Sequence, residues 1–113
     1  EHINGKPEKI KELALAVQEY TLGLDTAMEE NPKKFYIAYK ISQNIVCMEI
    51  RKSKILLYIK LNPNDFSPLP EIARDVGVTG HYGTGDLEIT LKTSADFTVA
   101  KQFIEQAYNK VGG

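Results

Sequence analysis

The sequence predicts an α+β domain: an antiparallel sheet of about four or more strands, with an N-terminal and a C-terminal helix packed on one face. Apolar residues recur every three or four positions near both ends of the chain, which is the spacing of amphipathic helices. Between these ends, short β-rich segments alternate apolar with polar residues and are joined by tight connections. Two helices that cover one face of an antiparallel sheet form the economical arrangement for this pattern.

The first element is a helix over residues 7–24. Pro7 suits its first turn and Gly23 its end. One apolar stripe runs along it, formed by Ile10, Leu13, Val17, Tyr20 and Leu24.

Three strands follow as an antiparallel meander, over residues 34–41, 45–50 and 55–61. Alternation gives each strand one apolar side, so we expect one buried sheet face and one mixed face. The mixed face receives Tyr36 and Lys40 from the first strand, and Tyr58 and Lys60 from the third.

The second half of the chain begins with a proline-rich loop at residues 62–70, followed by a helical turn at residues 71–76. Residues 86–91 alternate again and form a fourth strand. The last helix begins after an N-cap at Ser94 or Thr93, the latter in a loose capping box with Asp96, and Gly112 ends it.

Composition restricts the class of protein. The 113 residues suit one domain spanning the whole chain, and its lack of an initiator Met indicates that it was excised from a longer chain. A net charge of −1 creates no overall attraction to DNA or to anionic membranes. No apolar run reaches the ~18 residues of a membrane helix. The single cysteine, Cys47, favours a reducing compartment and hence a cytoplasmic protein.

The segment "GVTGHYGTGD", residues 77–86, is the main candidate for a ligand site. It precedes a strand rather than a helix and lacks the Lys-Ser/Thr pair of a P-loop, which argues against nucleotide binding. Its glycines either form consecutive turns or let a ligand approach the backbone. The ligand-binding candidates are Arg74, Asp75, His81, Tyr82, Gly83, Gly85 and Asp86. The alternative is that each charged residue only forms a surface ion pair or caps a turn.

A second candidate surface combines aromatic and basic residues on the sheet. Tyr36, Lys40, Tyr58 and Lys60 have the composition of a platform for single-stranded nucleic acid. The alternative is a solvated face with extended lysines. The sequence shows neither a metal-ligand pattern nor a cofactor motif nor a catalytic nucleophile, so we expect no metal and no cofactor.

The segments "KKFYIAYKISQNIVCMEIRKSKILLYIKL", "ARDV…GHYGTGDLEITL" and "IEQAYN" resemble a bacterial and archaeal domain family of unknown function, over residues 33–108. The family is often labelled "predicted transport protein", and Tyr82 stands where its members often have Trp. The resemblance implies a module fused to larger proteins, some of them with nuclease-like or defence-associated domains. The architecture is also similar to the YjbR-like family, which is described as predicted DNA-binding.

These observations favour a non-enzymatic binding or accessory module that contacts nucleic acid or a fused or partner nuclease-like domain. One alternative is a small-ligand or catalytic site at residues 80–86. Another is a purely structural or dimerisation domain. The sequence does not specify an oligomeric state.

Overall fold

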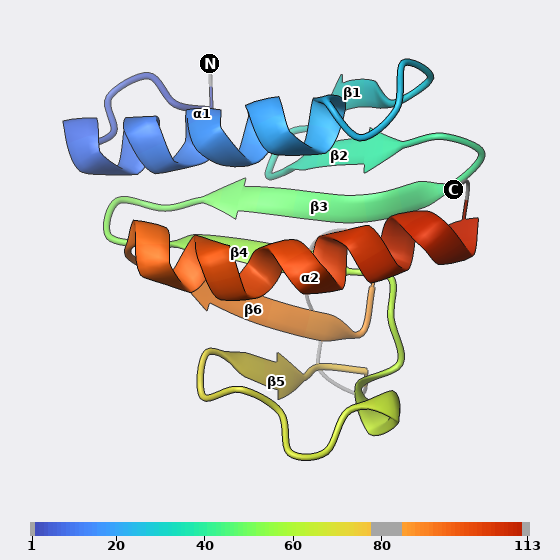
Figure 1. Ribbon diagram of the computed structural model, residues 1–113. Coiled ribbons are helices and arrows are strands. Elements are labelled where there is room, and N and C mark those ends of the chain that lie inside the picture. Colours follow the sequence, from blue (N-terminus) through green and yellow to red (C-terminus); the bar gives the residue numbers. More distant parts are fainter. Residues whose placement is uncertain (1, 78–84, 112–113) are drawn as a thin grey trace.

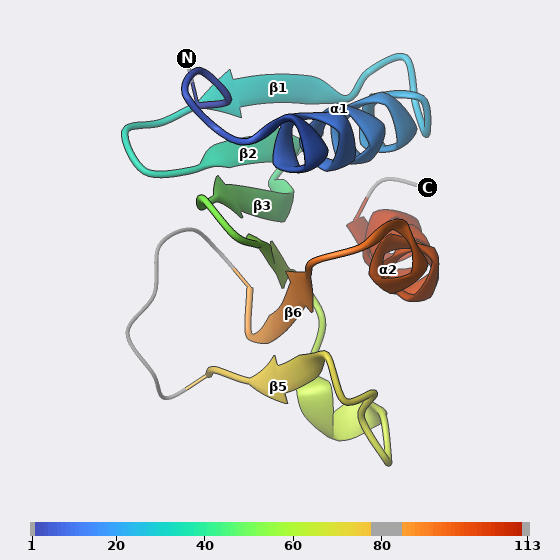
Figure 2. The same ribbon diagram turned by 90° about the vertical axis from the view of Figure 1, so that its left-hand side faces the viewer.

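The computed structural model describes residues 2–77 and 85–111. They form a six-stranded antiparallel sheet with two helices on one of its faces (Figures 1 and 2). In chain order the elements are α1 (Glu8–Leu22), β1 (Glu29–Pro32), β2 (Ile37–Lys40), β3 (Asn44–Ile50), β4 (Ile55–Ile59), the short 3-10 helix η1 (Pro63–Asp65), β5 (Ala73–Asp75), β6 (Leu87–Leu91) and α2 (Ser94–Val111). The predicted α+β class and the placement of both helices on one face are confirmed.

The sheet order is β1-β2-β3-β4-β6-β5. The chain leaves β4, forms β5 at the outer edge, and returns as β6 between the two. The proline-rich segment therefore spans the width of one strand. Its Phe66 ring packs edge-on against Phe103 of α2, with ring centroids 5.1 Å apart, which ties this connection to the helical layer.

Two corrections to the predicted elements concern the sheet edges. The predicted helical turn at residues 71–76 is wrong, because Ala73–Asp75 pairs with β6 as β5. Residues 25–33, for which no element is predicted from the sequence, contain β1, which pairs with β2. Both edge strands are short and lack a buried alternating pattern. Their conformation is fixed by the neighbouring strand rather than by their own sequence.

The main hydrophobic core fills the space between the sheet and the helices. Its largest fully buried side chains are Tyr39, Ile45, Met48, Ile55, Leu57, Ile59, Leu87, Ile89, Leu91 and Ile104. The amphipathic stripe of α1 contributes Ile10, Leu13 and Val17, as predicted. The two helices meet where the Tyr20 ring packs edge-on against Phe97 and its hydroxyl donates to the carboxylate of Glu105.

A smaller cluster covers the other face, which we call the distal face. Ala38, Cys47, Leu56, Tyr58 and Val76 form it, with Tyr36 packed against it. The sheet is therefore apolar on both sides at its centre, more so than the single buried face that alternation predicts. Cys47 is buried and not disulfide-bonded.

No helix among residues 2–77 and 85–111 combines the length and the apolar character that a membrane crossing requires.

Candidate binding site on the distal face of the sheet

The distal face carries a row of directly paired residues that runs across three strands. Tyr58 of β4 lies opposite Glu88 of β6, and Glu88 lies opposite Arg74 of β5. Because side chains alternate along a strand, the burial of Leu87 and Ile89 in the main core directs Glu88 to the distal face. The register of the sheet thus brings an aromatic hydroxyl, a carboxylate and a guanidinium together.

Glu88 is the centre of this row. Its side chain is only 7% exposed, and Arg74 approaches it with Nε at 2.7 Å from Oε1 and a second nitrogen at 3.4 Å from Oε2. The Tyr58 hydroxyl also donates to this carboxylate. Burial acts to raise the pKa of Glu88, but the hydrogen bonds from Arg74 and Tyr58 and the charges of Arg74 and Lys54 outweigh it. The pKa of Glu88 therefore lies below its ordinary value of 4.5.

A second ion pair lies on the same face. Arg51 holds Glu49 through Nε at 2.7 Å from Oε2. The other carboxylate oxygen, Oε1 of Glu49, is buried and has no hydrogen-bond partner in the structure. The hydrogen bond to Glu49 raises the pKa of Arg51, and Tyr58 and Glu88 add to that effect, which places both ion pairs in one electrostatic neighbourhood.

Beside this row lies a shallow hollow of about 620 Å³. Its lining comes from β5, β6, the residues adjoining β4, β5 and β6, and the start of α2: Lys54, Glu71, Ile72, Ala73, Arg74, Glu88, Thr90, Lys92 and Asp96. Two of its three acids are held by other groups of the protein, and the third, Glu71, is exposed. Glu88 is paired with Arg74, and Oδ2 of Asp96 accepts hydrogen bonds from the backbone N–H groups of Lys92 and Thr93.

The cationic side chains of the hollow are less constrained. The Arg74 side chain is 65% exposed although its Nε and one terminal nitrogen contact Glu88, so its remaining guanidinium donors face solvent. Lys54 and Lys92 form no ion pair among the residues that the structure describes. The arrangement can therefore present three cationic groups to an anion, with one of them oriented by a buried carboxylate.

The predicted ligand-binding residues do not share one site in the part of the chain that is described. Arg74 lines the hollow above, whereas Asp86 and Gly85 line a different one, of about 390 Å³, with Lys60 and Lys110. Asp75 accepts a hydrogen bond from the N–H of Gly77 at 2.9 Å.

A Cβ placed on Gly77 would touch the carboxylates of both Asp75 and Asp86, so these two acids flank it. His81, Tyr82 and Gly83 lie outside the described residues, as does Gly112. No group of three or more potential metal ligands occurs within residues 2–77 and 85–111.

Gly85 has a structural role in the described part of the glycine-rich segment. Its φ is 124°, and a Cβ there would lie 2.6 Å from the carbonyl oxygen of Ile59. The glycine is required because the backbone passes directly against β4 as it enters β6. At Gly85 the structure therefore shows the positive φ of the predicted turns, and the approach of a ligand to the glycines stays a prediction.

The predicted aromatic platform needs a correction at Tyr58. Tyr58 lies on the predicted side of the sheet, but it is 3% exposed and packs within the distal-face cluster, so its ring is not available for base stacking. Tyr36 is half-buried against that cluster. Lys40 lies at a register shift between β2 and β3, and Lys60 lies just beyond β4.

The sites predicted from the sequence include neither Lys92 nor Glu49. For Glu88 a signal existed, because it is an acid between two core residues of a strand. Lys92 gave no such signal, since it lies in the turn between β6 and α2.

The fold defines the class of protein: a small α+β domain with two helices on one face of an antiparallel sheet. The chain belongs to the family described as "Domain of unknown function (DUF5655)", which matches residues 1–110 and so includes α1. It is similar to an uncharacterized protein of Haemophilus influenzae, with 32% identity over 107 residues. That match covers 95% of this chain and only 35% of the relative. No solved structure matches the chain.

Proposed function

We propose that this domain is a non-enzymatic binding module that contacts the phosphate backbone of nucleic acid through the hollow on its distal face. The observation that carries the proposal is the orientation of Arg74 by the buried carboxylate of Glu88, beside Lys54 and Lys92. A guanidinium fixed at Nε keeps donors free for a phosphate oxygen. Two lysines without ion pairs among the described residues add charge around the same space.

The small net charge of the chain limits the strength and the kind of this contact. A module with about two or three phosphate contacts gives weak, sequence-independent binding with a salt slope of about −2 to −3. Because Tyr58 is buried, base stacking contributes little. The proposal therefore rests on contacts with the phosphate backbone of the nucleic acid. Such contacts suit an accessory module that is attached to a domain that carries out a reaction.

The relative supports an attached role. The chain spans about a third of that protein's length, 35%, so the family occurs as one region of a longer chain. The resemblance of the sequence to modules fused to nuclease-like and defence-associated proteins is consistent with this arrangement. Contact with a fused partner domain is thus the second candidate function. Burial of the single cysteine is in keeping with a cytoplasmic setting.

The first test measures binding of the domain to fluorescent single- and double-stranded DNA and RNA between low and moderate salt. We expect the double variant Lys54→Gln/Lys92→Gln to weaken binding to every sequence similarly and to flatten the salt slope by about two. The matched control is Lys11→Gln/Lys33→Gln, which removes the same charge outside the hollow.

Absence of salt-sensitive binding to all four nucleic acids would refute the nucleic-acid proposal. Equal losses in the two double variants would instead show that only net charge matters and that the hollow has no special role. In the first case contact with a partner domain becomes the leading function.

A further inference from the structure

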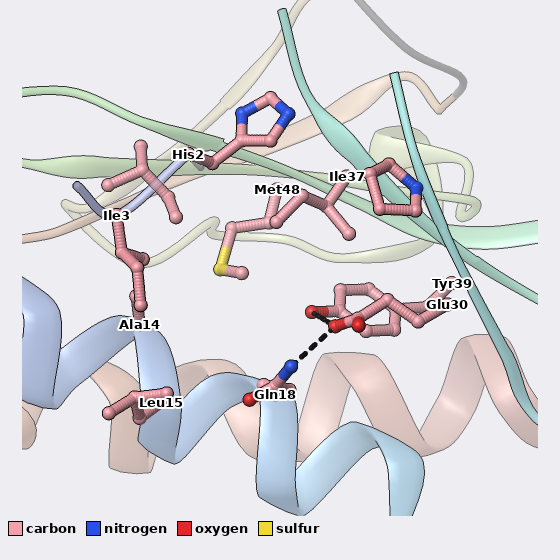
Figure 3. Close-up of a pocket in the computed structure, with 11 residues that line it drawn as sticks. His2, Ile3, Ala14, Leu15, Gln18, Glu30, Ile37, Tyr39 and Met48 are labelled. Atoms are coloured by element: carbon pink, nitrogen blue, oxygen red, sulfur yellow. Dashed lines mark hydrogen bonds between the residues drawn. The ribbon is translucent and has the colours of Figure 1, made fainter. Parts of the chain in front are cut away.

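A separate cavity of about 250 Å³ lies on the helix side of the sheet, between α1 and strands β1, β2 and β3 (Figure 3). Its lining consists of His2, Ile3, Ala14, Leu15, Gln18, Glu30, Pro32, Ile37, Tyr39, Met48 and Ile50. It shares no residue with the distal-face hollow. Any ligand here is therefore independent of the proposed phosphate contact.

Most of the wall is apolar. Ala14, Ile37, Met48 and Ile50 are core residues, and their side chains form the deep part of the cavity. Leu15 lies at the margin and is 48% exposed, one of two large hydrophobic side chains with that exposure among the described residues. Apolar surface thus continues from the core to solvent. An apolar cavity of ~150 Å³ holds a benzene molecule, so this one has room for a ring with a short substituent.

The polar end of the cavity is built around Glu30. Gln18 of α1 donates to Oε2 at 2.7 Å, and the hydroxyl of Tyr39 donates to the same oxygen at 2.9 Å (Figure 3). Both donors are uncharged. The other oxygen, Oε1, accepts no hydrogen bond in the structure and is not among the buried unpartnered atoms. Glu30 forms no ion pair within the described residues.

The surroundings fix Glu30 in place. Tyr39 is fully buried, and burial together with the hydrogen bond to Glu30 raises the pKa of its phenol, so the hydroxyl stays a donor. His2 Nε2 lies 2.6 Å from the carbonyl oxygen of Lys33, which holds the N-terminal segment beside the cavity as a further wall. His2 is the only lining residue that can carry a positive charge.

Two neutral hydrogen bonds use about half of the acceptor sites of the Glu30 carboxylate, so Oε1 is open to a cationic donor inside the cavity. We propose that this cavity binds a small monocationic amine, with its apolar body between Leu15, Ile37 and Met48 and its ammonium group on Oε1 of Glu30. The apolar wall supplies affinity through burial of hydrocarbon surface. The carboxylate selects an ammonium over an alcohol or an acid of the same shape.

The experiment uses three probes of one shape and different charge: 2-phenylethylamine, 2-phenylethanol and phenylacetate. Each is titrated at pH 7 into the domain with labelled methyl groups and amides. We expect the amine to shift the methyl signals of Leu15, Ile37 and Met48 with an affinity in the millimolar range. The alcohol binds about tenfold more weakly, and phenylacetate does not shift these signals.

Glu30→Gln keeps an acceptor for Gln18 and Tyr39 but removes the charge, so we expect about a tenfold loss for the amine and little change for the alcohol. Glu29→Gln is the matched control, because Glu29 is the exposed neighbour on β1 and does not line the cavity. Its affinity for the amine should equal that of the unaltered domain.

Leu15→Ser provides a second variant that does not disturb the core, because Leu15 is half exposed. It should weaken the binding of the amine by about fivefold through loss of apolar contact. The proposal is overturned if no probe shifts the cavity signals, if the three probes bind equally, or if the amine binds Glu30→Gln and Leu15→Ser as well as it binds the unaltered domain.

Discussion

Glu88 shows how one residue can serve both the fold and the candidate site. Its carboxylate is buried on the distal face, where it is paired with Arg74 and Tyr58. Removal of a single partner would leave a buried charged or polar group, which is costly. The same contacts orient Arg74 toward the hollow, so the stability of the row and the geometry of the anion site depend on one carboxylate.

The lowered pKa of Glu88 gives a pH-dependent prediction. Because its pKa in the folded state lies below the ordinary value of 4.5, ionised Glu88 stabilises the fold above pH 4.5, and this contribution is lost as the pH falls through the folded-state pKa. Glu88→Gln should therefore lower the free energy of unfolding by about 1 kcal/mol at pH 7, and the difference from the unaltered domain should shrink below pH 4.5.

Urea unfolding at a series of pH values measures this effect. Glu71→Gln is the control, since Glu71 lines the same hollow but is exposed and has no ion pair among the described residues. A difference between the Glu88 variant and the unaltered domain that stays constant down to pH 3 would contradict the assigned pKa shift.

The sequence anticipates individual site residues only in part, and the reason is register. Alternation correctly places Tyr58 on the face away from the core, yet it cannot tell that Glu88 and Arg74 lie beside it. That information comes from the order β4-β6-β5, in which β6 inserts between two strands that precede it in the chain. A reading of consecutive segments has no means to predict this insertion.

At the level of elements, the N-terminus of α2 is the best-specified feature. The hydroxyl of Thr93 accepts a hydrogen bond from the N–H of Asp96 at 3.2 Å, and Asp96 Oδ2 accepts from the N–H groups of Thr93 and Lys92. This reciprocal pattern is a capping box, and it identifies Thr93 rather than Ser94 as the cap. The spacing of Thr and Asp in the sequence indicated this capping box but left Ser94 as an alternative cap, and the hydrogen bonds decide for Thr93.

Substitution at this cap should have a measurable and specific effect. Thr93→Ala removes the hydroxyl acceptor and should lower the free energy of unfolding by about 1 kcal/mol, whereas Thr93→Ser should retain most of the stability. Ser94→Ala is the neighbouring control and should change little, because the side chain of Ser94 makes no capping bond. Urea denaturation would decide the assignment, and a larger loss for Ser94→Ala would reverse it.

In contrast to the N-terminus of α2, the edge strands β1 and β5 are poorly specified by their own residues. β1 ends in Pro32 and contains Glu29 and Glu30, and β5 is only three residues long. Acidic residues, proline and short length are features that protect sheet edges against further pairing. They also remove the alternating apolar pattern by which a strand is recognised in a sequence. For this reason β1 and β5 could not be predicted from their own residues.

Across the whole molecule, the sheet is covered unevenly from its centre to its edges. β3 and β4 lie in the middle, with the main core on one side and the distal-face cluster on the other. β1 and β5 are outermost and mostly half-buried or exposed. Both helices lie on one face of this sheet, as Figure 2 shows. The structure should therefore open from its edges inward.

Native-state amide hydrogen exchange tests this expectation. Amides of β3 and β4 should exchange only through global unfolding, because their hydrogen bonds are covered on both faces of the sheet. Amides of β1 and β5 should exchange at least about tenfold faster and show little dependence on low urea concentrations, as local opening exposes little surface. Uniform protection across all six strands would instead show that the edges unfold together with the core. In that case the edges would be as cooperative a part of the fold as its centre.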